Sequence, residues 1–154
     1  MKAVEDDIDL ETYVPALINI LSSRLSSSAS ATYRALFALS VLEWRILVLL
    51  AKESGLSAQQ VGSVVGQHKG PVSRAVRVLE SKSLVRVDFA EKGHRHELSI
   101  TPQGMDLYTT SIPIAMERQR RLLLGFSEAE CEQLRNFLKR LIAHIPDVAR
   151  VHST

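Results

Sequence analysis

The chain has 154 residues, of which 45% are hydrophobic, and a formal net charge of +2. This length suits one compact subunit with a single substantial core. The sequence has no apolar run of the roughly 18 residues that a membrane span requires and no N-terminal signal pattern, so we expect a cytoplasmic protein without a membrane partner. Its single cysteine, Cys131, excludes an internal disulfide and a zinc-finger ligand set.

The charges are unevenly distributed along the chain. Residues 1–13 carry a net −4, so the remainder carries +6, and residues 67–100 alone carry +3. A basic segment of this kind suits contact with phosphate. An ordinary solvated surface explains such charges equally well, so charge alone does not establish a nucleic-acid partner.

Residues 10–37 predict a long first helix. Apolar residues recur there at helical spacing, at Leu10, Val14, Leu17, Ile18, Leu21 and Leu25, and again at Tyr33, Leu36 and Phe37. A serine-rich stretch, residues 26–30, separates the two groups. We expect the helix to continue through it, since serine is a middling helix former, with a break there as the alternative.

Paired residues at helix starts predict where the next two helices begin, because the unpaired N–H groups of a first turn select particular side chains. Ser40 with Glu43 forms a capping box that opens a helix, which Gly55 can close in the left-handed conformation. Ser57 with Gln60 opens a short helix in the same way. Two short helices are therefore expected between residues 40 and 66.

A further helix follows Gly66. Gly70 and Pro71 suit its cap and first helical position, since proline lacks only a donor that would be unpaired there, and the helix should run to about Ser83. One face of its helical wheel is apolar and should pack inward, with Val72, Ala75, Val76 and Leu79. The other face is small, polar and basic, with Gly70, Ser73, Arg74, Arg77 and Ser81.

The period changes to two beyond Leu84, which predicts a β-hairpin. Val85, Val87 and Phe89 alternate with Arg86 and Asp88, and the alternation resumes at His96, Leu98 and Ile100. Residues 91–94 can form the turn between the strands. Two helices should follow: one capped by Thr101, running to about residue 124 with a kink at Pro113, and one opened by a capping box of Ser127 with Glu130, which carries an apolar stripe before Pro146.

Two short helices joined by a tight link and followed by a hairpin describe a winged helix-turn-helix, in which the second helix enters the major groove. The outward face of residues 70–81 has the residue types that this contact needs. A small residue allows close approach, a guanidinium bonds both acceptors of a guanine, and a hydroxyl reaches a base or a phosphate. An ordinary amphipathic helix with solvated arginines is the alternative, which the basic segment around it disfavours.

At these residues the chain resembles the MarR family, the multiple-antibiotic-resistance-type regulators. The anchors of the resemblance, in chain order, are residues 42–47 (LEWRIL), 55–57 (GLS), 61–62 (VG), 72–76 (VSRAV), 79–85 (LESKSLV), 98–104 (LSITPQG) and 117–119 (ERQ). The resemblance implies a mainly α-helical fold with a small β-hairpin, in which a winged helix-turn-helix is joined to a helical dimerisation region. It also implies an N-terminal dimerisation helix at 1–37, a DNA-binding lobe at 38–101 and C-terminal dimerisation helices at 102–154.

The expected function is that of a homodimeric, sequence-specific transcriptional regulator that binds a pseudo-palindromic operator in double-stranded DNA. The resemblance further implies a repressor that a small, aromatic effector releases from DNA. Ser73, Arg74 and Arg77 are the predicted groove contacts, with Gly70 allowing close approach and Lys69 assisting. The effector would contact residues drawn from the first two helices, namely Tyr33, Phe37, Trp44 and Arg45, although aromatic residues at such positions are more often core.

The wing tip departs from the family pattern. The family usually has an aspartate followed two residues later by an arginine, whereas the best alignment here places Lys92 and His94, with Arg95 displaced by one. Either His94 or Arg95 could therefore supply the wing's contact with the minor groove or a phosphate.

Other classes of function find little support in the sequence. His94 and His96 share a strand face but lack an evident third ligand, so we expect no metal site and no cofactor. No phosphate loop, nucleophile elbow or paired-carboxylate motif stands out, so we expect no enzyme. A winged-helix protein-interaction module that has lost DNA binding is the remaining alternative.

Overall fold

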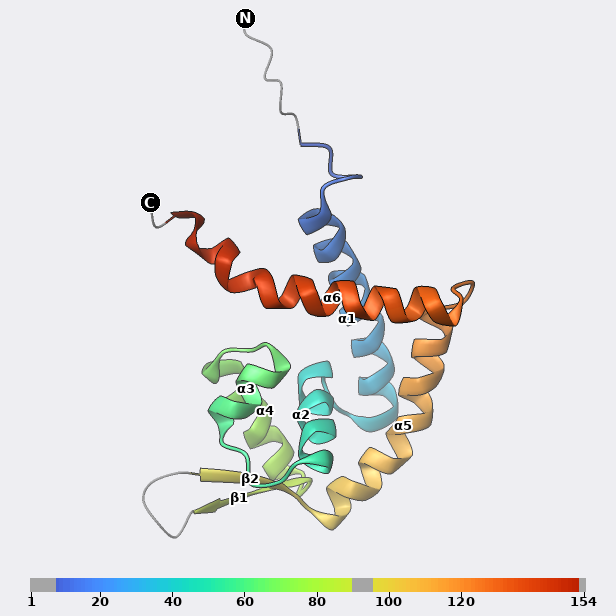
Figure 1. Cartoon of the computed structure of the whole chain (residues 1–154). Coiled ribbons are helices and arrows are strands. Elements are labelled where there is room, and N and C mark those ends of the chain that lie inside the picture. The colour runs from blue at the N-terminus through green and yellow to red at the C-terminus, as the bar shows by residue number, and fades with distance from the viewer. Residues whose placement is uncertain (1–7, 90–95, 153–154) are drawn as a thin grey trace, which may run out of the picture. The chain divides into compact units, whose positions relative to one another are not determined.

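The computed structural model describes residues 8–89 and 96–152. The chain forms two compact units that divide between Ser111 and Ile112. The first unit contains α1 to α4, the two strands and the first half of α5, and the second contains the rest of α5 together with α6. The predicted order of helices and strands is confirmed (Figure 1).

The first helix, α1, runs without a break from Val14 to Phe37 and so passes through the serine-rich stretch, as expected. It ends at Ala38, whose backbone is left-handed with φ of 53°. In its last turns Ala29 and Tyr33 are buried. The apolar side chains of its N-terminal half are exposed, including Val14, Leu17, Ile18, Ile20 and Leu21.

The second and third helices, α2 (Val41–Lys52) and α3 (Ala58–Val65), begin at the two predicted capping boxes. At the first box the Ser40 hydroxyl accepts a bond from the Glu43 N–H at 3.2 Å, and the Glu43 carboxylate accepts one from the Ser40 N–H at 2.9 Å. Gly55 is left-handed but does not cap α2, which already ends at Lys52. Its N–H donates instead to the carbonyl of Leu98, which brings the chain alongside the hairpin.

The fourth helix, α4, runs from Lys69 to Ser81 and begins earlier than predicted. Its N-cap is His68, so Gly70 and Pro71 already lie inside the first turn. The helix also ends slightly before the predicted Ser83, which adopts a left-handed φ of 58°. The Ser83 N–H bonds to the Glu80 carbonyl and the Leu84 N–H to the Leu79 carbonyl, the two bonds of a Schellman motif.

The hairpin consists of β1 (Val85–Phe89) and β2 (His96–Ile100), paired antiparallel from Val85 opposite Ile100 to Phe89 opposite His96. Leu56 adds an isolated bridge to Leu98, so the segment before α3 lies along the hairpin. The predicted strands are confirmed.

The last two helices are α5 (Pro102–Leu122) and α6 (Glu128–Val148), followed by a short 3-10 helix at Ala149–His152. The α5 helix is continuous through Pro113. The α6 helix includes Pro146 and extends to Val148, beyond the apolar residues that the sequence singled out. No residue of α6 is buried.

The core of the first unit lies where α2, α3 and α4 pack together and against the hairpin (Figure 1). Its most deeply buried side chains are aliphatic: Leu39, Ile46, Leu47, Leu50, Val61, Val72, Leu79, Val85 and Leu98. Each of these helices contributes at least one of them, so the core fixes α4 against the rest of the lobe.

Candidate nucleic-acid interface

A close approach of two backbones shapes the turn between α3 and α4. The Gln67 N–H donates to the carbonyl of Gly62 at 2.9 Å. A Cβ on Gly62 would lie only 2.7 Å from the Gln67 carbonyl oxygen, so only glycine fits without a shift of the turn. Gly66 ends α3 with a left-handed φ of 68°. These two glycines set the direction in which α4 leaves the turn.

The apolar face of α4 packs into the lobe as its helical wheel predicts. Val72 and Leu79 are completely buried, and Ala75 and Val76 are at most 7% exposed. This packing determines which side of α4 faces outward. Burial of four apolar side chains stabilises the helix in this orientation by several kcal/mol, at about 25 cal/mol per Å² of apolar surface.

The opposite face of α4 is basic and exposed. Lys69, Gly70, Arg74 and Arg77 are exposed, whereas Ser73 is half-buried. Among the residues that the structure describes, the side chains of Lys69, Arg74 and Arg77 form no hydrogen bond or ion pair. Their charges are therefore not neutralised by neighbours on the lobe. The Ser81 hydroxyl, in contrast, donates to the Val78 carbonyl at 2.8 Å within the helix.

The wing carries a cation that the sequence did not single out as a site residue. The Arg86 guanidinium forms an ion pair with Asp88 at 2.7 Å, and both side chains are largely exposed. The sequence contained a signal for this ion pair, because residues two apart on a strand, such as Arg86 and Asp88, have their side chains on the same face. The predicted wing contacts His94 and Arg95 lie outside the described residues.

The base of the wing is joined to α4 and α5 by a tight set of contacts. The Thr101 hydroxyl donates to the Ser83 carbonyl at 2.6 Å and accepts a bond from the Gly104 N–H at 3.0 Å. The Thr101 N–H donates to the Leu84 carbonyl at 3.1 Å. Thr101 thus caps α5, as predicted, and also connects the end of α4 to the end of β2.

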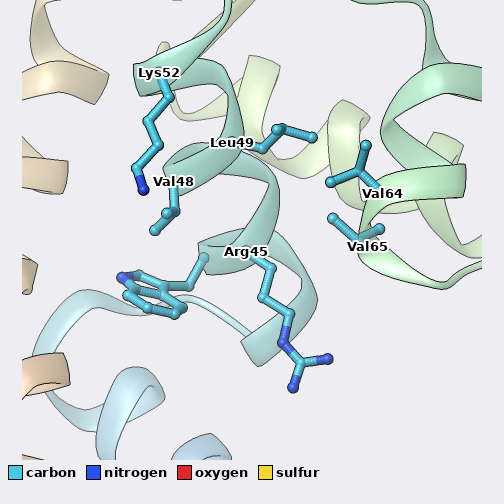
Figure 2. Close-up of a pocket in the computed structure, with 7 residues that line it drawn as sticks. Arg45, Val48, Leu49, Lys52, Val64 and Val65 are labelled. Carbon is cyan, nitrogen blue, oxygen red and sulfur yellow. The ribbon is translucent and has the colours of Figure 1, made fainter. Parts of the chain in front are cut away.

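The predicted effector residues fall into two places. Trp44 and Arg45 line a groove of about 390 Å³ between α2 and α3. Figure 2 shows Val64 and Val65 of α3 facing Leu49 of α2 across it, with Arg45 and Lys52 extending from α2. No acidic side chain lines the groove, and neither cation has a hydrogen bond or ion pair within the described part of the chain.

Tyr33 and Phe37 do not line this groove. Tyr33 is buried, with its ring centroid 4.7 Å from that of Trp44 and 6.2 Å from that of Phe37. The Trp44 indole N–H donates to the hydroxyl of the fully buried Ser111 at 2.9 Å, and this hydroxyl donates to the Tyr108 carbonyl at 2.8 Å. These aromatic side chains form a packed, hydrogen-bonded junction between α1, α2 and α5.

The second unit carries an exposed ion network on α5. Glu117 accepts bonds from Arg120 at 2.7 and 2.8 Å and from Arg121 at 2.6 Å. The two guanidinium groups hold the pKa of the Glu117 carboxyl down, from 4.5 to about 2.

Across the described residues, no group of three or more histidine, cysteine, aspartate or glutamate side chains is placed to bind a metal ion. None of the described helices is both long and apolar enough to cross a membrane.

The fold and the exposed basic face together define a winged helix-turn-helix protein. A profile of the MarR family matches residues 37–96, which include α2 to α4 and β1. A MarR/EmrR family transcriptional regulator from Acinetobacter sp. ADP1 is 33% identical, with a TM-score of 0.85 over 91% of this chain and 99% of that one. The chain therefore belongs to the MarR family, which consists of transcriptional regulators and not of enzymes.

Two other solved structures are similar over almost the whole chain. A MarR family regulator from Silicibacter pomeroyi is 25% identical, with a TM-score of 0.78 over 96% of this chain and 97% of that one. A putative MarR family regulator from Listeria monocytogenes, solved in complex with a 26mer DNA, is 23% identical and has the same fold, with a TM-score of 0.80 over 92% of this chain and 91% of that one. A comparison with curated proteins found no match.

Proposed function

We propose that this protein regulates transcription by binding duplex DNA sequence-specifically through the exposed face of α4. The observation that carries the proposal is the pair Arg74 and Arg77, exposed and without described partners on the side of α4 opposite four buried residues. The structural relative from Listeria monocytogenes that was solved with DNA supports it at the level of the fold.

The chemistry of this face suits the major groove. A guanidinium can donate to both O6 and N7 of a guanine, so Arg74 and Arg77 would read bases. Ser73 would donate to a base or a phosphate, and Gly70 leaves room for the groove floor. Lys69, in the first turn, would neutralise a phosphate, and His94 and Arg95 would add a wing contact.

The proposed assembly is a homodimer, in which residues 1–37 and 102–154 form the subunit interface and residues 38–101 form the DNA-binding lobe. The α6 helix supports this, because its apolar stripe is exposed: Leu134, Phe137, Leu138, Leu141, Ile142, Ile145 and Val148. Exposed apolar surface of this extent marks an interaction site. A twofold dimer would set two α4 helices about 34 Å apart, one DNA turn, and so require a pseudo-palindromic operator.

The proposed regulation is repression that a small, aromatic effector relieves. The groove between α2 and α3 supports a ligand site, because it is lined both by the aromatic Trp44 and by Arg45, a cation without an ion pair in the described part of the chain. A ligand releases DNA only if it binds the DNA-free conformation more tightly, so its effect on operator affinity is the measurement that matters.

The test begins with duplexes selected from random DNA by the wild-type protein. Arg74→Ala should weaken binding to the selected duplex by about 1 to 3 kcal/mol and relax the preference at one base position of each half-site. Arg140→Ala, which removes an exposed arginine from α6, is the matched control and should bind normally.

Unchanged affinity of Arg74→Ala in a titration at fixed salt would reject this residue as a contact. If the wild-type protein selects no duplex and shows no salt-dependent affinity, DNA binding itself is rejected. The chain would then be a winged-helix protein-interaction module.

A further inference from the structure

The C-terminal end of α4 is held on two sides by bonds from side chains to backbone carbonyls. The Lys82 ammonium, from the residue that caps α4, donates to the carbonyl of Ala38 at the end of α1. On the other side the Thr101 hydroxyl donates to the Ser83 carbonyl at 2.6 Å. The end of α4 is thereby connected both to α1 and to the start of α5.

The Lys82 bond is a direct connection between the end of α4 and the end of α1, which otherwise meet through α2. Both α1 and α4 pack on α2, but they make few direct contacts with each other. Beside Lys82 lies a hollow of about 400 Å³, which Phe37, Leu84 and Leu107 help to line. The Lys82 bond therefore links the end of α4 directly to the end of α1, in addition to the packing of both helices on α2.

The chemistry at Ala38 favours a cation. The last carbonyls of a helix lack partners within the helix and lie at the negative end of its dipole. Ala38 follows directly after α1, with its backbone left-handed, so its carbonyl has no further helical turn to bond to. An ammonium group donates a hydrogen bond to this carbonyl and is also attracted to the negative end of the helix dipole. A neutral apolar side chain of similar length can do neither.

We propose that Lys82 is a positioning residue that sets the distance between the two DNA-reading helices of the dimer. In the function proposed above, on which this inference rests, α1 belongs to the subunit interface and α4 reads the operator. The separation of the two α4 helices then depends on how each is fixed to its own α1. Lys82 acts through Ala38 and makes no contact with DNA in this role.

The experiment measures affinity for a set of duplexes that carry the wild-type operator with its half-site spacing changed by one or two base pairs in either direction. Each added base pair moves one half-site by about 3.4 Å along the axis, so the wild-type protein should show a sharp optimum. Lys82→Met removes the ammonium and keeps a long side chain. It should lower the preference for the optimal spacing about fivefold to tenfold, mainly by weakening the best duplex.

Two further variants separate positioning from a direct DNA contact. Lys82→Arg keeps a donor cation and should retain most of the spacing preference. Lys69→Met removes a proposed phosphate contact and should weaken all spacings equally, with a shallower salt dependence. Thermal unfolding and the oligomeric state are checked for each variant. If Lys82→Met does not fold, Lys82→Ser replaces it, because the short serine hydroxyl cannot reach the Ala38 carbonyl.

Two results would overturn the inference while leaving DNA binding intact. One is an unchanged spacing preference in Lys82→Met, which would show that the bond does not position α4. The other is an equal loss on every spacing together with a shallower salt dependence, which would make Lys82 a phosphate contact. A wild-type protein without affinity for any duplex would refute the proposed function, and this inference with it.

Discussion

Replacement of Gly104 by alanine tests the packing at the base of the wing. A Cβ at this position would lie 2.1 Å from the Leu84 carbonyl oxygen and 2.8 Å from Cγ1 of Ile100. Ordinary contact begins at 3.4 Å, which is about 1.3 Å further from the Leu84 oxygen, so the start of α5 must move away from the wing and weaken the bonds that Thr101 makes there. Two effects destabilise the variant: overpacking costs about 1–3 kcal/mol, and each weakened hydrogen bond costs about 1 kcal/mol. Together they exceed the stabilisation of about 1 kcal/mol that alanine gives a helix relative to glycine.

Gly104→Ala should therefore lower the free energy of unfolding by about 3 kcal/mol, which corresponds to a fall in Tm of roughly 6 to 12 °C for a chain of this size. Urea denaturation and thermal melts at one fixed protein concentration measure both quantities, since the proposed dimer would make Tm concentration-dependent.

Gly66 is the control, because it needs glycine for a different reason. Its φ is 68° and an added Cβ would meet nothing within 4 Å. Gly66→Ala should cost about 1 to 2 kcal/mol from the left-handed backbone alone, and Gly66→Asn less, since asparagine tolerates this region. At Gly104 the order should reverse, with asparagine worse than alanine because it is larger. If Gly104→Ala is as mild as Gly66→Ala, or if the order does not reverse, the steric argument is refuted.

Two smaller effects concern a helix end and an ion network. Ser83→Gly should raise the free energy of unfolding by about 1 kcal/mol, because Ser83 has a left-handed φ of 58° and glycine adopts it without strain; a melt showing no gain would contradict this. The pKa of Glu117 is lowered from 4.5 to about 2 in the folded chain, so its stabilising effect is present above pH 4.5 and is lost as the pH falls towards 2. Glu117→Gln should remove this part of the acid destabilisation in melts across that range, and an unchanged pH profile would show that the network contributes nothing.

The sequence predicts best those features that depend on residues close together in the chain. All three capping boxes, the two strands of the hairpin and the buried face of α4 follow from spacings of two to four residues, and the structure confirms them. The predicted first and last residues of a helix were less accurate where two local signals compete. Proline at position 71 suits a first helical residue, yet it is equally acceptable two residues further into the first turn, which is where α4 places it.

The features that the sequence did not reveal join residues that are far apart in the chain. The bond from Trp44 to Ser111 spans 67 residues, and that from Lys82 to Ala38 spans 44. No periodicity connects such pairs, because each depends on how whole helices pack. For the same reason the predicted effector residues separate into a groove and a buried aromatic junction: Trp44 belongs to both, whereas Tyr33 turns into the core. An aromatic side chain in a helix does not indicate by itself which of these it will line.

The salt dependence of DNA binding would reveal how the cations of α4 divide between phosphates and bases. Lys69, Arg74 and Arg77 would give the proposed dimer six cations on its two α4 helices. If all six neutralised phosphates, α4 would contribute a slope of about −5 to the plot of log affinity against log salt, at about −0.9 per contact. If the arginines read bases and only Lys69 contacts phosphate, the contribution falls to about −2. Arg74→Ala distinguishes the two cases, because the slope becomes shallower by about 2 only if Arg74 contacts phosphate. An unchanged slope with a lower affinity would identify Arg74 as a reader of sequence, and for a chain with a net charge of only +2 that is the result we expect.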